Sequence, residues 1–213
     1  MALEIPPEKK NATKLDTSLL PLNHSKILIP YIQAMAAAPF ALEAVQMEKN
    51  GKAWNILEIG LGTGILNSFL HDVFSSMNIT TIELEEGMYE IAKKYFGLVE
   101  DNYNKIIVGD GLLYLQKTAG QSKFDVIFID ACYNTVVEVM CPVEAFLMKE
   151  NLKIIKEALT KNGIVVISVL TFEDDKLSEV LACGEFRRNK SRFAKKLKEI
   201  YEKFEFYSEP NIE

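Results

Sequence analysis

The stretch Trp54–Leu66 constrains the fold of this chain more than any other. Residues 56–59 are apolar except for Glu58, as expected of a strand buried in a parallel sheet. Three glycines follow at alternate positions: Gly60, Gly62 and Gly64. Glycines at the end of a buried strand allow a tight turn and let a ligand approach the backbone. A helix from about Ile65 would point its N-terminal N–H groups at that ligand. The stretch predicts a ligand-binding turn, and a plain strand-to-helix turn is the alternative.

The spacing of these glycines distinguishes between cofactors. A dinucleotide site carries G-x-G-x-x-G, whose third glycine lets the helix pack under a pyrophosphate. Here the third glycine comes one residue early, which disfavours an NAD-dependent reductase. Glu58 would repel a pyrophosphate by about 1 kcal/mol or more at contact range, but it would attract an ammonium group. The pattern E-x-G-x-G-x-G therefore favours S-adenosylmethionine, and it resembles the first motif of the class I S-adenosylmethionine-dependent methyltransferases.

Composition limits the architecture and the partners. A chain of 213 residues that is 48% hydrophobic can bury one substantial core. Its formal net charge is −6, whereas nonspecific nucleic-acid binding requires a basic face, so no nucleic-acid partner is expected. The sequence has no apolar run of about 18 residues and no signal-peptide core near Met1. We therefore expect a cytoplasmic location and no membrane contact.

The cysteines indicate a reducing compartment. Cys132, Cys141 and Cys183 are odd in number and show no C-x-x-C spacing, so we predict three free thiols. The two histidines are far apart in the sequence, and no metal site is proposed.

The first 50 residues are predicted to cover one edge of the site. Residues 1–13 are polar and are expected to form a loose arm. Residues 24–47 predict one or two short helices interrupted by Pro30 and Pro39. His24 and Tyr31 in this part are expected to cap and pack rather than react. Residues 51–213 are expected to form the cofactor-binding α/β domain.

Strands and helices alternate in that domain. Strands are predicted at 56–59, 79–84, 105–108, 124–130, 164–170 and 204–207, and helices at 65–74, 87–96, 112–117, 143–160 and 191–203. A loop is expected over 131–141, and 172–188 has no assigned element. Such alternation is typical of a mostly parallel sheet covered by helices on both faces.

Acidic residues end or follow four of these strands: Glu58, Glu83, Asp110 and Asp130. In an open α/β sheet, ligands lie across the carboxyl ends of the strands. Glu83 is expected to accept hydrogen bonds from two ribose hydroxyls. Asp110 and Gly111 would contact the adenine edge, and Asp130 would lie beside the transferable group. One such acid is more often a cap or loop residue, but four in register favour a cofactor site.

Several runs resemble the spermidine-synthase-like branch of the class I methyltransferases: 82–88, 95–97, 109–115 and 124–130. Residues 140–142 with Ala145 and Phe146, and Tyr31 with Met35 upstream, are similar to the methyltransferase-like protein 13 family, in its C-terminal domain. The resemblance covers about residues 57–170. It implies a Rossmann-like methyltransferase fold and S-adenosyl-L-methionine as cofactor. It also implies methylation of a protein substrate, elongation factor 1-alpha.

The chain departs from this branch in three places. Polyamine synthases carry a second acid in a D-x-x-D arrangement, whereas no acid follows Asp130 until Glu138. They also carry an aspartate within the glycine turn, where this chain has Thr63 and Gly64. Both differences disfavour aminopropyl transfer. The residues after 207 are too few for the final antiparallel strand of class I methyltransferases, so we expect this seventh strand to be missing.

These observations predict in-line methyl transfer to a protein amine. Asp130 is the candidate that orients the amine or takes its proton, and Tyr133 and Asn134 in the following loop would assist. Two alternatives stay open: a polyamine aminopropyltransferase, and a catalytically inactive methyltransferase-fold partner protein. A homodimer is compatible with the sequence.

Overall fold

The computed structural model describes residues 2–9, 14, 16, 20–47, 53–74, 77–118, 120–121, 123–171, 177–185 and 189–206. The strands are β1 (Ala2–Leu3), β2 (Leu22–Asn23), β3 (Trp54–Ile59), β4 (Met77–Glu83), β5 (Asn104–Val108), β6 (Phe124–Ile129), β7 (Val139–Cys141), β8 (Leu159–Thr171) and β9 (Leu177–Gly184). The α-helices are α1 (Pro30–Ala41), α2 (Ile65–Val73), α3 (Glu86–Phe96), α4 (Gly111–Thr118), α5 (Lys149–Ala158) and α6 (Lys190–Lys203). The described residues also form short 3-10 helices, η1 (Pro7–Lys9) and η3 (Glu144–Leu147).

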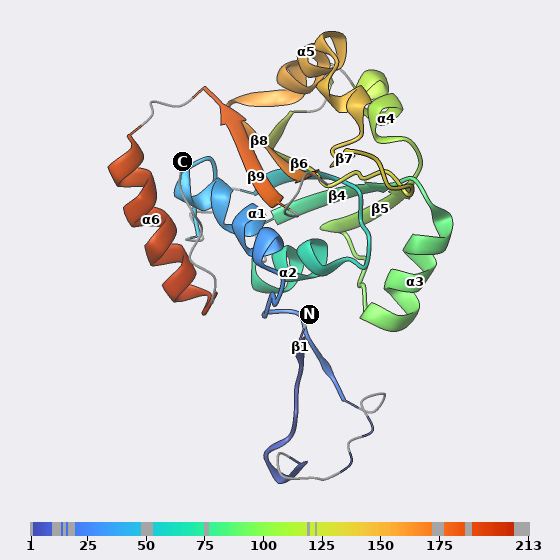
Figure 1. The fold of residues 1–213 in the computed structure, drawn as a ribbon, viewed down its shortest axis with the longest axis vertical. Helices are drawn as coiled ribbons and strands as arrows, with labels where there is room; N and C mark the ends of the chain where they lie inside the picture. Colours follow the sequence, from blue (N-terminus) through green and yellow to red (C-terminus); the bar gives the residue numbers. More distant parts are fainter. Residues whose placement is uncertain are drawn as a thin grey trace.

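The main sheet is mostly parallel. Its strands follow the order β5-β4-β3-β6-β8, and every pair along this series is parallel. The short strand β7 and the longer strand β9 both pair with β8 in antiparallel register. β1 and β2 pair with each other, away from the main sheet (Figure 1). This arrangement confirms the predicted Rossmann-like α/β class.

Helices cover both faces of the sheet (Figure 1). Alternate residues of β3 point to opposite faces, as the pleat of a strand requires. Ile56 packs in a core with α1, α2 and α6, whereas Leu57 packs in a core with α4 and α5. The sheet is therefore buried between two apolar layers, which leaves its strand ends as the place for a ligand.

Helix α1 is apolar almost all round. Every residue from Ile32 to Ala41 is buried except Ala34, which is partly exposed. A helix that is enclosed by the core on all sides is expected to be apolar on all sides. Gln33 is the buried polar exception, and its side chain donates to the backbone oxygen of Ile27 at 2.7 Å.

The prolines do not interrupt this helix, so the predicted breaks are wrong. Pro30 is its first residue, where the missing N–H costs nothing because no partner exists for it there. Pro39 lies in the last turn, close to the end of the helix at Ala41. One continuous helix therefore replaces the one or two short helices expected over 24–47.

Two other predicted elements are wrong. The long helix over 143–160 is instead the 3-10 helix η3 followed by α5, because Met148 between them is extended. Phe146 of η3 packs in the core with residues of α4 and α5. The short strand over 204–207 is also absent from its described part, because Phe204 and Phe206 follow α6 in a turn and pack with Phe69.

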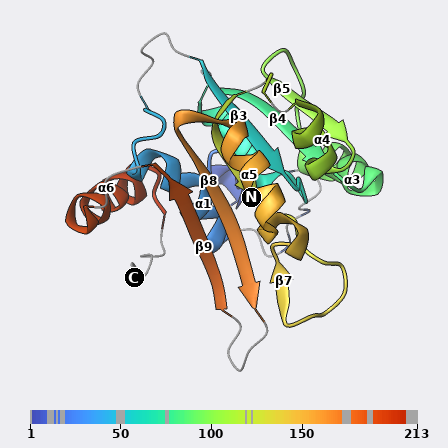
Figure 2. The same ribbon diagram turned by 90° about the horizontal axis from the view of Figure 1, so that it is seen from above.

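The far edge of the sheet is formed by β9, which lies within residues 172–188, where no element was predicted. β9 runs antiparallel to β8, from the pair Ile164–Gly184 to the pair Thr171–Leu177 (Figure 2). It supplies an antiparallel edge strand that was not predicted. The described residues contain no further strand paired with β9, and residues 207–213, on which the expected absence of a seventh strand was based, lie outside them. The domain boundary near residue 50 stays a prediction, although α1 packs in the same core as α2 and α6.

Candidate active site

The carboxyl ends of the central strands are joined by backbone hydrogen bonds. The Gly60 N–H donates to Ile82 at 2.9 Å, and the Asp130 N–H donates to Ile59 at 2.9 Å. The Gly109 N–H donates to Glu83 at 2.8 Å. These bonds bring the turns after β3, β4, β5 and β6 to one edge of the sheet, where the sequence predicted the site.

The three glycines of the turn have different environments. Gly60 has a φ of +92°, and a Cβ atom there would lie 2.4 Å from the backbone oxygen of Asp130. Gly64 has a φ of +75° and precedes α2. Gly62 has a φ of +53° and is exposed, and a Cβ atom there would meet nothing within 4 Å. Gly60 therefore allows the close approach of two backbones, while Gly62 leaves the turn accessible.

Glu83 holds the glycine turn from the next strand. Its Oε2 accepts the N–H groups of Leu61 at 2.8 Å and Gly62 at 3.2 Å. Its Oε1 accepts the N–H of Glu85 at 2.9 Å. The side chain is buried, with 6% exposed. A ribose bound here would share a carboxylate that already organises the turn.

Glu58 lies inside the protein rather than on an open surface. It is 2% exposed, and its Oε2 accepts the Thr81 hydroxyl at 2.8 Å. Thr81 in turn accepts from Asn67 of α2 at 2.9 Å. Burial raises the pKa of Glu58 to about 8, with a smaller contribution from nearby Asp130, while the bond from Thr81 opposes the rise.

The predicted adenine contacts have structural roles of their own. The Oδ1 of Asp110 accepts the N–H groups of Leu112 at 2.8 Å and Leu113 at 3.0 Å, which caps the start of α4. Asp110 is exposed, whereas Gly111 is buried. A Cβ atom at Gly111 would lie 2.5 Å from the side chain of Ile59.

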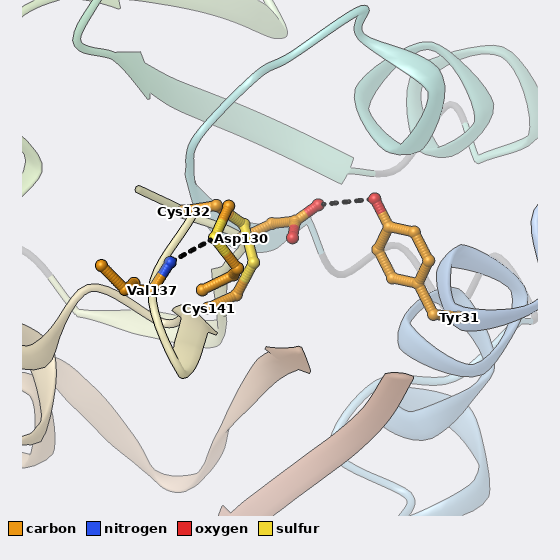
Figure 3. The surroundings of a disulfide bond; sticks show 6 residues. Tyr31, Asp130, Cys132, Val137 and Cys141 are labelled. Atoms are coloured by element: carbon orange, nitrogen blue, oxygen red, sulfur yellow. Dashed lines mark hydrogen bonds between the residues drawn. A yellow bond between two sulfur atoms is a disulfide. The ribbon is translucent and has the colours of Figure 1, made fainter. Parts of the chain in front are cut away.

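Asp130 lies near hydroxyl groups from two distant elements. The Tyr31 hydroxyl of α1 donates to its Oδ2 at 3.3 Å (Figure 3). The side chain of Ser168 on β8, which is 3% exposed, also lies near it. Burial raises the pKa of Asp130, and the nearby Ser168 hydroxyl and the bond from Tyr31 oppose the rise. The pKa of Tyr31 is also raised, by burial and by the charge of Asp130.

The loop after β6 differs from its prediction. Cys132 and Cys141 form a disulfide, so the prediction of three free thiols is wrong for this pair. Folding brings the two cysteines together, although their spacing in the sequence gave no sign of it. Cys183 is exposed and lies outside the disulfide. The Tyr133 hydroxyl accepts the N–H of Glu144 at 3.2 Å, so its described hydrogen bond is to the first residue of η3 rather than to Asp130.

The structure thus brings together Glu58, Glu83 and Asp130 around the glycine turn. The sequence predicted a packing role for Tyr31 and gave Ser168 no role. Ser168 is the one hydroxyl residue within the apolar run 164–170, and this polar position in a buried strand could have marked it as a candidate site residue. Tyr31 could be assigned only after the fold had placed α1 beside the end of β6.

The surroundings of the turn suit a cofactor without phosphate. The carboxylate of Glu83 binds the turn, and residues 54–92 contain neither lysine nor arginine. A bound phosphate would find no cationic side chain in this segment, whereas an ammonium or sulfonium group would find carboxyl groups. These side chains therefore fit S-adenosylmethionine. Among the described residues, no group of three or more His, Cys, Asp and Glu side chains could hold a metal ion.

Comparison with known proteins identifies the family. The spermine/spermidine synthase domain matches residues 41–195, which is most of the chain. The chain belongs to this family. No helix in the described part of the chain is long and apolar enough to cross a membrane.

Individual relatives of the chain have two kinds of name. The chain is 28% identical over 177 residues to the eEF1A lysine and N-terminal methyltransferase of Xenopus laevis, covering 82% of this chain and 24% of that protein. It is 27% identical over 154 residues to the polyamine aminopropyltransferase of Vibrio vulnificus, covering 71% of this chain and 46% of that protein. The chain therefore spans less than half of the length of either relative.

A solved structure supports the fold. Human methyltransferase-like protein 13 in complex with SAH superposes with a TM-score of 0.74 at 22% identity, covering 86% of this chain and 96% of that chain. At this identity the likeness establishes the shared Rossmann-like methyltransferase fold.

Proposed function

We propose that the chain is an S-adenosylmethionine-dependent methyltransferase that acts on an amine of a protein. The observation that carries the proposal is Asp130, a half-buried carboxyl group beside the glycine turn that accepts the Tyr31 hydroxyl and lies near Ser168. The names of the methyltransferase relatives and the likeness to a structure with SAH support it. In this proposal the cofactor supplies the methyl group.

The chain's own residues would bind the cofactor by position and charge. Gly60, Gly62 and Gly64 shape the turn, and Glu83 orients its N–H groups. We assign Glu83 to the ribose hydroxyls, and Asp110 with Gly111 to the adenine edge. Glu58 would act from below the turn as a mostly protonated group that holds Thr81 in place, because burial raises its pKa to about 8.

Asp130 would take the proton that the acceptor amine loses. An amine must be neutral before it can attack, and a base with a raised pKa accepts that proton more readily. Burial raises the pKa of Asp130 in this way. Because the methyltransferase relatives are named for eEF1A, we propose a lysine or N-terminal amine of such a protein as acceptor, and a cytoplasmic location. We propose Tyr133 as an assisting residue on the acceptor side. Whether the chain forms a homodimer is a separate proposal that this site does not require.

Calorimetry with S-adenosylmethionine tests the cofactor assignment. The wild type is expected to bind, and Glu83→Ala to bind at least tenfold more weakly because it loses charge-assisted bonds to the ribose. Glu90→Ala, an exposed acid on α3, is the matched control and is expected to bind like the wild type. Equal affinity of Glu83→Ala and the wild type would contradict the ribose assignment. No binding by the wild type would favour an inactive partner protein.

Aminopropyl transfer is the second candidate, because the family and the Vibrio relative are named for it. The absence of an acid between Asp130 and Glu138 argues against it, since a cationic polyamine requires nearby carboxylates. Product analysis decides between the two. We expect methylated eEF1A with S-adenosylmethionine, and no spermidine with putrescine and decarboxylated cofactor.

A further inference from the structure

The disulfide between Cys132 and Cys141 lies at the edge of the proposed site. Cys132 is two residues beyond Asp130, and Figure 3 shows the cross-link beside that side chain. Cys132 is exposed, whereas Cys141 at the end of β7 is 3% exposed. Cys132 is therefore the cysteine of the pair that solvent can reach.

The cross-link closes the base of an exposed loop. The Tyr133 N–H donates to Met140 at 2.9 Å, and the Val143 N–H donates to Ala131 at 2.9 Å, on either side of the cysteines. Between them the loop is open to solvent, and Val136 is 78% exposed. The loop is thus fixed at its base by two backbone bonds and one covalent bond, and its last residues in β7 also pair with β8.

We propose that Cys132 and Cys141 form a reversible thiol–disulfide modification site that reacts with small thiols of the glutathione class. Its redox state sets how firmly the loop 133–140 is held beside Asp130. An effect of the disulfide on methyl transfer rests on the proposed function, because the loop borders the acceptor side of the site only if Asp130 serves methyl transfer. The glycine turn is held by Glu83 instead, so its order is independent of the disulfide.

The exchange is balanced in electrons and protons. A small thiolate attacks the sulfur of exposed Cys132, the S–S bond breaks, and the sulfur of Cys141 leaves as a thiolate that takes a proton. A second small thiolate then attacks the mixed disulfide at the sulfur of the small thiol, which releases the Cys132 thiolate, protonated by solvent, and an oxidised small disulfide. The protein gains two electrons and two protons, and the oxidised small disulfide reverses the reaction.

The test uses the full chain with Cys183→Ser, so that the pair supplies the only thiols. The protein is equilibrated in buffers of reduced and oxidised glutathione, alkylated and weighed by mass spectrometry. We expect zero alkylated thiols in oxidised buffer and two in reduced buffer, with full reversal. Amide hydrogen exchange at Tyr133 and Val143 should be at least tenfold faster in the reduced form, and exchange at Leu61 should be unchanged.

The triple variant Cys132→Ser, Cys141→Ser, Cys183→Ser is the control, and it should exchange fast in every buffer. A pair that resists millimolar glutathione, or that stays reduced in oxidised buffer, would overturn the proposal. So would equal exchange rates in the two forms. Neither readout uses methyl transfer, so a failure of the proposed function leaves this result unaffected.

Discussion

The two sides of the site are built differently. On the cofactor side, Glu83 accepts N–H groups of the backbone, and Asp110 does the same at α4. On the acceptor side, Asp130 accepts the Tyr31 hydroxyl and lies near the hydroxyl of Ser168. A backbone N–H can only donate, whereas a hydroxyl can donate or accept. The cofactor side is therefore suited to hold a fixed carboxylate, and the acceptor side to tolerate a carboxyl group that gains and loses a proton.

The largest expected effect concerns the contact between the two sides. Gly60→Ala would place a Cβ atom 2.4 Å from the Asp130 backbone, and we expect a loss of about 4 kcal/mol in the free energy of unfolding. Gly62→Ala is the matched control, because it meets open space and should cost only about 1 kcal/mol of backbone strain. Urea denaturation measures both. Equal losses would show that Gly60 is not the point where the sides meet.

A second effect concerns turnover. Asp130→Asn keeps the shape of the side chain but removes the base, and we expect a decrease of about 100-fold in kcat. Binding of S-adenosylmethionine should change little, because Glu83 and the turn are intact. Tyr31→Phe should lower kcat less and shift its pH profile, because it removes one bond to Asp130. Unchanged turnover in Asp130→Asn would remove its role as the base.

A third effect is the pH dependence of stability. The pKa of Glu58 is raised from 4.5 to about 8 in the folded protein, so the folded state binds more protons than the unfolded state between these values. Stability should therefore fall as the pH rises from about 5 to about 7, by on the order of 2 kcal/mol, since one pKa unit corresponds to about 1.4 kcal/mol. Urea denaturation at a series of pH values measures this slope. Glu58→Gln stays neutral and should flatten it, and an unchanged slope in the variant would assign the pH dependence to another group.

The two sides also differ in what could be predicted from the sequence, because one depends on neighbours in sequence and the other on distant residues. The strand, turn and helix around Gly60–Gly64 depend on neighbours in sequence, and the structure has them as predicted. Tyr31 reaches Asp130 across 99 positions, and Cys132 meets Cys141 where β7 lies on β8. Contacts of that kind follow from the packed fold rather than from a local pattern. Likewise, β9 depends on its pairing with β8 and carries no clear strand pattern of its own.

The smallest expected effect separates a cap from a cofactor contact. Asp110→Ala removes the acceptor for Leu112 and Leu113 and should cost about 1 kcal/mol of stability, whereas Asp110→Asn keeps a cap and should cost little. If the carboxylate also contacts adenine, both variants should bind S-adenosylmethionine more weakly. Thermal unfolding and calorimetry on the same two variants distinguish these roles. Normal binding by Asp110→Ala would leave Asp110 with the cap alone, and the adenine contact would then fall to the backbone of Gly111.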